Sequence, residues 1–314
     1  MAKSGHAPSL RLYASRHPDA ELSACCDIDA EKTSYFRREF GFLREYSDYM
    51  EMLREERPDA ALVLMPVALT AKVSMDVIRT GTNVMLEKPP GIHADETRAI
   101  HECALAHGVH ARVAFNRRYM PLVRALREEI AACGEMPVYA DCRFVRVGRT
   151  DADFCTTAIH AIDSIRCILN SDYRVASFTY QNFPYKNDRT GTNYYITADF
   201  ESGAAAHISF LTCGGCVAER ITVSCKDYTF FLELPVWMGL DMPGRLVCTH
   251  GGQAYKTLIG EHDTMFESSG FYDESASFFD LIRAGAAPAS DVSSGIQSVE
   301  IADCMRRREK IYMR

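Results

Sequence analysis

Short apolar runs and amphipathic helical patterns alternate through residues 20–115, and this alternation restricts the fold more than any other feature. The predicted strands are ELSACCDID (21–29), AALVLM (60–65), NVMLEKP (83–89) and VHARVAF (109–115). The helices predicted between them are EKTSYFRREFG (31–41), DYMEMLREE (48–56), TAKVSMDVIRTG (70–81) and HADETRAIHECALAHG (93–108). Such alternation is typical of βαβ units, so we expect an α/β, Rossmann-like domain with a doubly wound parallel sheet.

Capping residues support several of these boundaries. Asp29 is the predicted N-cap of the helix over 31–41, and Ser47 that of the helix over 48–56. Gly81 is suited to the end of the helix over 70–81, because glycine adopts the left-handed conformation without a steric penalty.

The pattern changes after Arg118. Strand-like segments now follow one another at 136–147, 174–180, 193–200, 204–211, 219–225 and 228–234. Predicted helices occupy 121–134, 156–170, 274–285 and 292–308. We therefore predict two domains: a dinucleotide-binding, Rossmann-like domain over residues 1–118, and a C-terminal α+β domain with an open, largely antiparallel sheet over residues 119–314.

Length and composition agree with two domains and exclude several classes of partner. A chain of 314 residues exceeds what one core usually holds. Its net charge of -7 argues against a nucleic-acid or anionic-membrane surface. The longest apolar stretch, at 60–71, is too short to span a bilayer and contains a proline. Twelve cysteines without a recognisable export signal indicate reduced thiols and a cytoplasmic protein.

Lys88 ends a predicted parallel strand, and the two prolines that follow stiffen the exit of the chain. Ligands of open parallel sheets bind beyond the carboxyl ends of the strands. A lysine there can donate a hydrogen bond to an alcohol or carbonyl oxygen while hydride moves at the attached carbon. The alternative is a lysine that merely extends its head group into solvent, and these residues alone do not decide between the two.

Asp27 follows the strand that corresponds to the second strand of a dinucleotide fold. An acid at this position hydrogen-bonds the ribose diol of NAD and disfavours the 2′-phosphate of NADP. The sequence therefore predicts NAD as cofactor, with NADP disfavoured.

The predicted helix over 156–170 carries a polar stripe with Thr156, His160 and Asp163 at helical spacing. His160 is a candidate general base at the interface of the two expected domains, because histidine titrates nearest to neutral pH. A buried structural histidine bonded to Asp163 is the alternative. Cys213 and Cys216 have the spacing of a redox or zinc pair, but no second pair completes a zinc site, so we predict no metal.

Taken together, these segments resemble the glucose–fructose oxidoreductase / inositol dehydrogenase (Gfo/Idh/MocA) family along nearly the whole chain. The matching segments are CDID (26–29), PDAALVLMP (58–66), EKP (87–89), FNRRYMP (115–121), IHAID (159–163), DFESGAAAHISF (199–210), YDESASFFDLIRAG (272–285) and SVEIADCM (298–305). The resemblance implies NAD(P)-dependent oxidation of a sugar, inositol or related polyol. It also implies a homo-oligomer formed through the C-terminal sheet.

The resemblance also assigns candidate site residues. It implies that Lys88 is the catalytic lysine and His160 the acid/base, while the FNRRYMP segment approaches the substrate. The candidate catalytic residues are Lys88, His160, Asp163 and Thr156; the cofactor-binding candidates are Gly5, Asp27, Pro66, Glu87 and Lys88; the substrate-binding candidates are Arg117 and Tyr119.

The sequence departs from the family pattern in three places. The apolar first strand and its glycine-rich loop are not found before Gly5 and His6, which resemble the tail of that loop. The missing strand belongs at the centre of the sheet, between the strand before Asp27 and the strand with Leu62, so we expect unpaired strand edges there. The loop MPVALT lacks the polar groups of the family's TPNxxH-like sequence, and Thr156 replaces a common aspartate.

These departures support a rival hypothesis. The chain would then be a non-catalytic family member, kept as a ligand-binding or subunit-assembly protein. Because the pyrophosphate amides come from the missing loop, we expect residues 1–314 to bind NAD weakly or not at all. Lys88 and His160 favour the enzyme hypothesis, and the three departures favour the rival.

Overall fold

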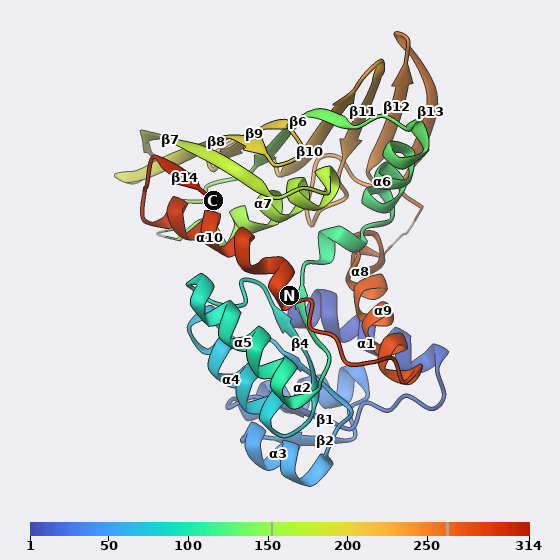
Figure 1. Cartoon of the computed structure of the whole chain (residues 1–314). Coiled ribbons are helices and arrows are strands. Elements are labelled where there is room, and N and C mark those ends of the chain that lie inside the picture. The colour runs from blue at the N-terminus through green and yellow to red at the C-terminus, as the bar shows by residue number, and fades with distance from the viewer. Residues whose placement is uncertain (152, 262–263) are drawn as a thin grey trace. The chain divides into compact units, whose positions relative to one another are not determined.

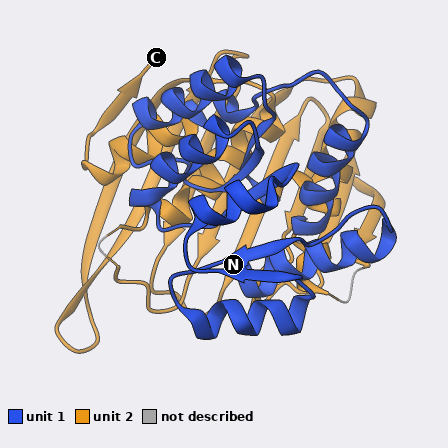
Figure 2. Cartoon of the chain, turned by 90° about the horizontal axis from the view of Figure 1, so that it is seen from below, with its two compact units in different colours: residues 1–116, 270–296 blue, residues 117–269, 297–314 orange. Residues whose placement is uncertain are grey.

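A computed structural model describes residues 1–151, 153–261 and 264–314. The chain forms two compact units (Figure 2): unit 1 comprises Met1–Asn116 and Gly270–Ile296, and unit 2 comprises Arg117–Ser269 and Gln297–Arg314. Residues 270–296 thus belong to unit 1, although the expected division at 118/119 assigned them to the C-terminal domain. The reason is local packing: the Tyr13 hydroxyl donates a hydrogen bond of 2.7 Å to Asp280.

Unit 1 contains two small parallel sheets. One pairs β1 (Ala24–Cys26) with β2 (Arg44–Tyr46), and the other has the order β3 (Ala60–Val63), β4 (Asn83–Glu87), β5 (Ala111–Ala114). The pairings of β3, β4 and β5 are parallel, as predicted, and the strand β2, which was not predicted, also pairs in parallel with β1. Within the described ranges no strand joins β1 to β3. The break lies where the sequence analysis expected a strand to be absent.

Helices surround these sheets in unit 1. They are α1 (Ala7–Arg16), α2 (Ala30–Phe40), α3 (Tyr49–Glu56), α4 (Val67–Arg79), α5 (Ala94–His107) and α9 (Phe271–Arg283), with short turns η1 (Ala2–His6) and η3 (Val292–Gly295). Asp29 caps α2 by accepting from the backbone N–H groups of Glu31 and Lys32, as predicted. The prediction of Ser47 as the next cap is wrong by one residue, because the Asp48 carboxylate accepts from the N–H groups of Met50 and Glu51 in α3.

Unit 2 is built on a nine-stranded sheet with the order β13-β12-β11-β10-β6-β9-β8-β7-β14 (Figure 1). Its strands are β6 (Pro137–Val145), β7 (Tyr173–Tyr185), β8 (Arg189–Phe200), β9 (Ala205–Leu211), β10 (Ala218–Cys225), β11 (Tyr228–Glu233), β12 (Arg245–His250), β13 (Gln253–Ile259) and β14 (Ile311–Met313). β6 and β9 pair in parallel, and the other neighbours pair antiparallel. The predicted open, largely antiparallel sheet is confirmed.

One face of this sheet is covered by helices. Unit 2 contains α6 (Pro121–Cys133), α7 (Cys155–Leu169), α8 (Met265–Ser268) and all but the first residue of η2 (Asn116–Tyr119) and α10 (Ile296–Arg306). Figure 1 shows α6 and α7 against the same face. Ala140, Cys142 and Phe144 of β6 are completely buried, whereas Tyr139, directly before them, is 40% exposed and Arg143, between the last two, is also exposed. The alternation identifies the inner and outer faces of the sheet.

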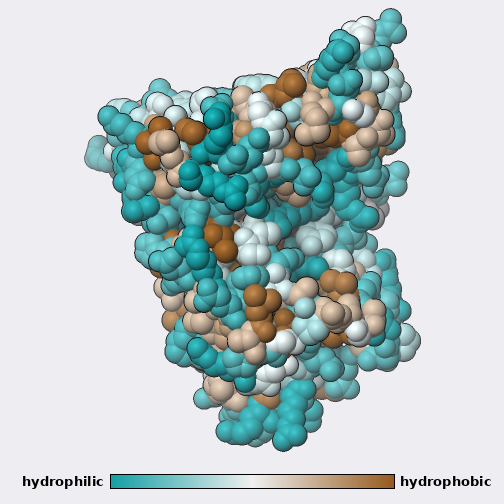
Figure 3. All heavy atoms as spheres, in the orientation of Figure 1, coloured by the Kyte–Doolittle hydropathy of each residue, from teal (hydrophilic) through white to brown (hydrophobic). Residues whose placement is uncertain are grey.

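The surface is mostly hydrophilic, with apolar side chains gathered in separate small groups in the orientation of Figure 3. Among the described residues, no helix is long and apolar enough to cross a membrane.

Candidate active site

Lys88 leaves the sheet of unit 1 at the carboxyl end of its middle strand. β4 lies between β3 and β5, and its residues Val84, Met85 and Leu86 are buried. Lys88 is half-buried, and its backbone N–H donates a hydrogen bond of 3.0 Å to the Oε2 atom of Glu87. The rigid strand therefore places Lys88 at the end of a parallel sheet where ligands bind.

The Glu87 carboxylate is held within the protein. Its Oε1 atom lies 3.0 Å from Nε2 of His6, whose side chain is fully buried, while the Glu87 side chain is 14% exposed. Burial on its own would raise the pKa of Glu87. The hydrogen bond and charge of His6, together with the charge of Lys88, outweigh burial and hold that pKa below its ordinary value. Glu87 was expected to contact the cofactor. Both of its carboxylate oxygens form hydrogen bonds within the protein, to His6 and to the backbone of Lys88.

Gly5 lies in η1, where its backbone N–H donates to the Met1 carbonyl at 2.8 Å. A Cβ atom at this position would lie 2.9 Å from the ring of Phe271, so only glycine permits this close approach. Pro66 precedes α4 and is exposed, and its carbonyl accepts from the Thr70 hydroxyl. Neither contact tests the predicted cofactor roles of Gly5 and Pro66.

Asp27 directly follows β1. Its Oδ1 atom accepts the backbone N–H of Asp29 at 3.0 Å and lies 4.0 Å from Nζ of Lys32. The side chain is 42% exposed, so the carboxylate remains accessible to a ligand.

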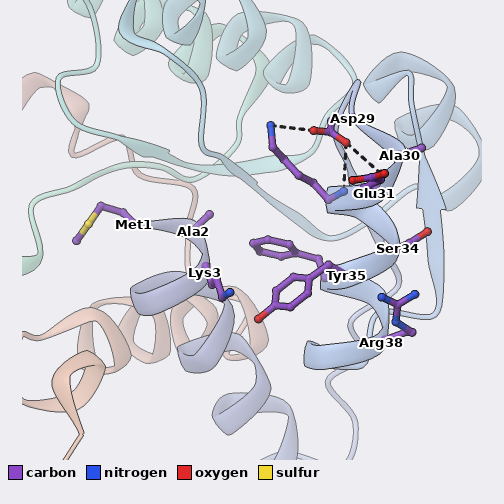
Figure 4. A pocket seen from close by; sticks show the side chains of 11 residues that line it. Met1, Ala2, Lys3, Asp29, Ala30, Glu31, Ser34, Tyr35 and Arg38 are labelled. Atoms are coloured by element: carbon purple, nitrogen blue, oxygen red, sulfur yellow. Dashed lines mark hydrogen bonds and ion pairs between the residues drawn. The ribbon is translucent and has the colours of Figure 1, made fainter.

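An open hollow of about 990 Å³ begins two residues beyond Asp27 (Figure 4). The hollow is lined by Met1, Ala2, Lys3, Asp29, Ala30, Glu31, Lys32, Ser34, Tyr35, Phe36 and Arg38. Figure 4 shows Tyr35 directed toward Lys3, and the Lys3 ammonium lies 4.4 Å from the centre of the Tyr35 ring. The lining combines aromatic rings with charges of both signs.

In unit 2, α7 carries Thr156 and His160 as half-buried residues and Asp163 as a buried one. The Asp163 carboxylate accepts two hydrogen bonds from Arg118, at 2.8 and 2.5 Å, and one from the Ser298 hydroxyl at 3.2 Å. Sequence reasoning missed this arrangement, since it considered Asp163 as the partner of His160. The buried charge of Asp163 is balanced by a guanidinium group.

Arg117 takes part in a second buried ion cluster. Its Nε and Nη2 atoms donate to the two oxygens of Glu219 at 2.7 and 2.6 Å, and Arg146 also bonds Glu219. Glu219 is completely buried. Burial on its own would raise the pKa of Glu219. The charges and hydrogen bonds of Arg117 and Arg146 lower it by more than burial raises it, so the pKa lies below its ordinary value. The Arg117 guanidinium is therefore bonded to a buried carboxylate, and Tyr119, two residues on in η2, is half-buried. The substrate roles of Arg117 and Tyr119 stay predictions.

The candidate residues fall into two sets. Unit 1 holds Gly5, Asp27, Pro66, Glu87 and Lys88, and unit 2 holds Arg117, Tyr119, Thr156, His160 and Asp163. In the part of the chain that the structure describes, no three histidine, cysteine or acidic side chains are grouped as a metal site would need.

Known proteins resemble this chain in sequence. A family described as "Oxidoreductase family, NAD-binding Rossmann fold" matches residues 4–115. Inositol 2-dehydrogenase of Burkholderia cenocepacia (strain HI2424) is 31% identical over 306 residues, covering 92% of this chain and 87% of the relative. The class defined by fold and sequence is thus that of Rossmann-fold oxidoreductases.

Solved structures share the fold of the whole chain. Levoglucosan dehydrogenase in complex with NADH has a TM-score of 0.79 at 15% identity, covering 98% of this chain and 95% of its own. A putative NADPH-dependent oxidoreductase from Desulfitobacterium hafniense has a TM-score of 0.81 at 14% identity, with 98% and 94% covered. The chain belongs to the Gfo/Idh/MocA family of oxidoreductases, as the sequence analysis predicted.

Proposed function

We propose that the protein is an NAD-dependent dehydrogenase of a sugar, an inositol or a related polyol. The observation that carries this proposal is Lys88, half-buried at the carboxyl end of the middle parallel strand, in a chain 31% identical to an inositol 2-dehydrogenase. Substrates of this class present the hydroxyl oxygen that such a lysine can bind.

The roles follow from the chemistry of the side chains. NAD, when bound, supplies the hydride acceptor. The Lys88 ammonium donates a hydrogen bond to the reacting oxygen and stabilises the negative charge that develops there. His160 accepts the hydroxyl proton. Thr156 can hydrogen-bond but carries no charge, so it assists in orientation only.

Asp27 is the residue that we propose for the ribose of the cofactor. Its exposed carboxylate beside the hollow of Figure 4 fits a ribose diol, and it would repel a 2′-phosphate. Lys32 partly balances this charge from 4.0 Å. We therefore propose a preference for NAD over NADP.

We also propose a cytoplasmic homo-oligomer. All twelve cysteines are free thiols, which suits a reducing compartment. The outer face of the nine-stranded sheet exposes Tyr139 by 40% and Phe231 by 46%, and such side chains are enriched in interfaces. Association through this face would bury them.

The rival function is that of a non-catalytic ligand-binding or subunit-assembly protein. Two observations favour it: β1 and β3 have no strand between them in the described ranges, and the Gly5 N–H is bonded to Met1. A cradle of free amides for the pyrophosphate is what a working Rossmann domain supplies.

A kinetic experiment separates the two functions. NADH formation is followed by absorbance with inositols and levoglucosan as substrates, and NAD affinity is measured by calorimetry. Lys88→Met should lower kcat roughly 100- to 10,000-fold while the NAD affinity changes little. Lys72→Met is the matched control, because Lys72 is 69% exposed in α4 and pairs with Asp76. Absence of both turnover and NAD binding in the unmodified chain would establish the rival function.

A further inference from the structure

A buried histidine and a carboxylate form a pair directly before Lys88. The Nε2 atom of His6 lies 3.0 Å from Oε1 of Glu87, and the other oxygen of Glu87 accepts the backbone N–H of Lys88 at 3.0 Å. The pair therefore connects the start of α1 with the exit of β4. The sequence analysis noted both residues but not their contact, since 81 positions separate them.

The surroundings of His6 hold its ring in one orientation. The ring lies edge-on to Phe271, with centroids 5.0 Å apart and an interplanar angle of 83°. Phe271 also packs on Gly5, where a side chain would not fit. Because Glu87 only accepts, the Nε2 atom of His6 must carry the hydrogen.

In the described part of the chain, the second ring nitrogen of His6 is left unsatisfied in the protein interior. This Nδ1 atom is buried and, among the described residues, forms no hydrogen bond. An apolar residue would fill the same space without leaving a buried nitrogen unsatisfied. A polar residue kept here needs a reason other than packing.

We propose that His6 is a positioning residue that acts through Glu87 to set the location of the Lys88 ammonium group. This inference rests on the proposed function, in which Lys88 binds the reacting oxygen. His6 does not touch substrate, so its role differs from that of Lys88 and His160.

The Glu87 carboxylate is attracted by His6 and by the charge of Lys88 next to it. With Oε1 held by His6 and Oε2 held by the backbone of Lys88, the carboxylate is fixed at the strand end. Without the His6 donor, Oε1 turns toward the Lys88 ammonium and draws it away from the place where the reacting oxygen binds.

Two substitutions of His6 test this role against a merely structural one. His6→Gln keeps an N–H donor near the position of Nε2, and His6→Leu removes it. Tyr13→Phe is the matched control, because Tyr13 is a buried residue of α1 whose hydroxyl bonds Asp280 instead of Glu87. All three variants are compared by thermal unfolding and steady-state kinetics.

We expect His6→Leu to lower kcat roughly 10- to 100-fold, as displacements near 1 Å do, with the KM for the polyol within about twofold. His6→Gln should recover at least about half of kcat, and Tyr13→Phe should keep the wild-type value. Equal kinetic losses in His6→Leu and Tyr13→Phe would overturn the proposal and reduce the pair to an anchor of α1.

A second readout needs no turnover and separates this inference from the proposed function. The folded protein is treated at pH 8 with an amine-reactive acetyl ester, and the rate of Lys88 acetylation is measured by mass spectrometry. We expect a rate at least about threefold lower in His6→Leu and unchanged in Tyr13→Phe, because a carboxylate closer to the ammonium favours its charged form. An unchanged rate in His6→Leu overturns the proposal even if the enzyme is active. A reduced rate supports it even if none of the polyols is oxidised.

Discussion

Replacing Glu219 with glutamine should destabilise unit 2 by about 3–5 kcal/mol, the usual cost of removing one partner from a buried ion cluster. The carboxylate is completely buried and bonded to Arg117 and Arg146, whose side chains are each 11% exposed. Glutamine would present an amide N–H to guanidinium groups that only donate, and two buried cations would lose their counter-charge.

Glu233→Gln is the matched control. Glu233 also accepts two hydrogen bonds from one arginine, Arg245, at 3.1 and 3.0 Å. This pair lies at the surface, with Arg245 52% exposed, so its loss should cost about 0–1 kcal/mol. Both variants replace a glutamate with a glutamine, and they differ in how deeply the glutamate is buried.

The assay is urea unfolding followed by tryptophan fluorescence. Trp237 is the only tryptophan and lies in unit 2, so the signal reports on that unit. The free energy of unfolding in water should fall far more for Glu219→Gln than for Glu233→Gln. Equal losses, or a loss below about 1 kcal/mol for Glu219→Gln, would refute the reasoning that the buried Glu219 cluster stabilises unit 2.

Three further outcomes are expected. Asp27→Ser should raise the ratio of kcat/KM for NADP to that for NAD by roughly tenfold, because the repulsion of the 2′-phosphate is removed; an unchanged ratio would exclude Asp27 from the cofactor site. The lowered pKa of Glu87 means that its carboxylate form stabilises unit 1 at pH values above the ordinary pKa of 4.5. This contribution is lost as the pH falls through the lowered pKa. Thermal unfolding between pH 3 and 7 should show this loss in the wild type and a weaker dependence in Glu87→Gln. Amide protons of β1 and β3 should exchange faster than those of β6 and β9, since strand edges open readily, and uniform protection by mass spectrometry would contradict this.

Local patterns predicted the fold well. The alternation of apolar runs and amphipathic helices predicted the parallel strands of unit 1 except the short β2, and period-two patterns predicted β6 to β11. The hairpin of β12 and β13 was not predicted, although Gly251 and Gly252 join the two strands and both have positive φ. A Gly-Gly pair between strand-like runs is a known hairpin signal, so that signal was available in the sequence.

The candidate site was predicted only in part, because sequence patterns show which side chains are present but not their partners. The position of Lys88 at a strand end followed from the order of elements. The partners of Glu87, Asp163 and Glu219 come from residues 81, 45 and 102 positions away, and no periodicity links them. Buried charges must be paired, so the patterns predicted that partners exist without identifying them.

Hydride transfer is the central claim, and isotope transfer tests it most directly. The protein is incubated with NAD and an inositol that carries deuterium on its carbinol carbons, and the reduced cofactor is analysed by mass spectrometry. We predict that deuterium appears on the nicotinamide ring with the wild type and with Lys72→Met, and that its rate of appearance falls at least about 100-fold with Lys88→Met. Reduced cofactor without deuterium, or equal rates with and without Lys88, would contradict the account.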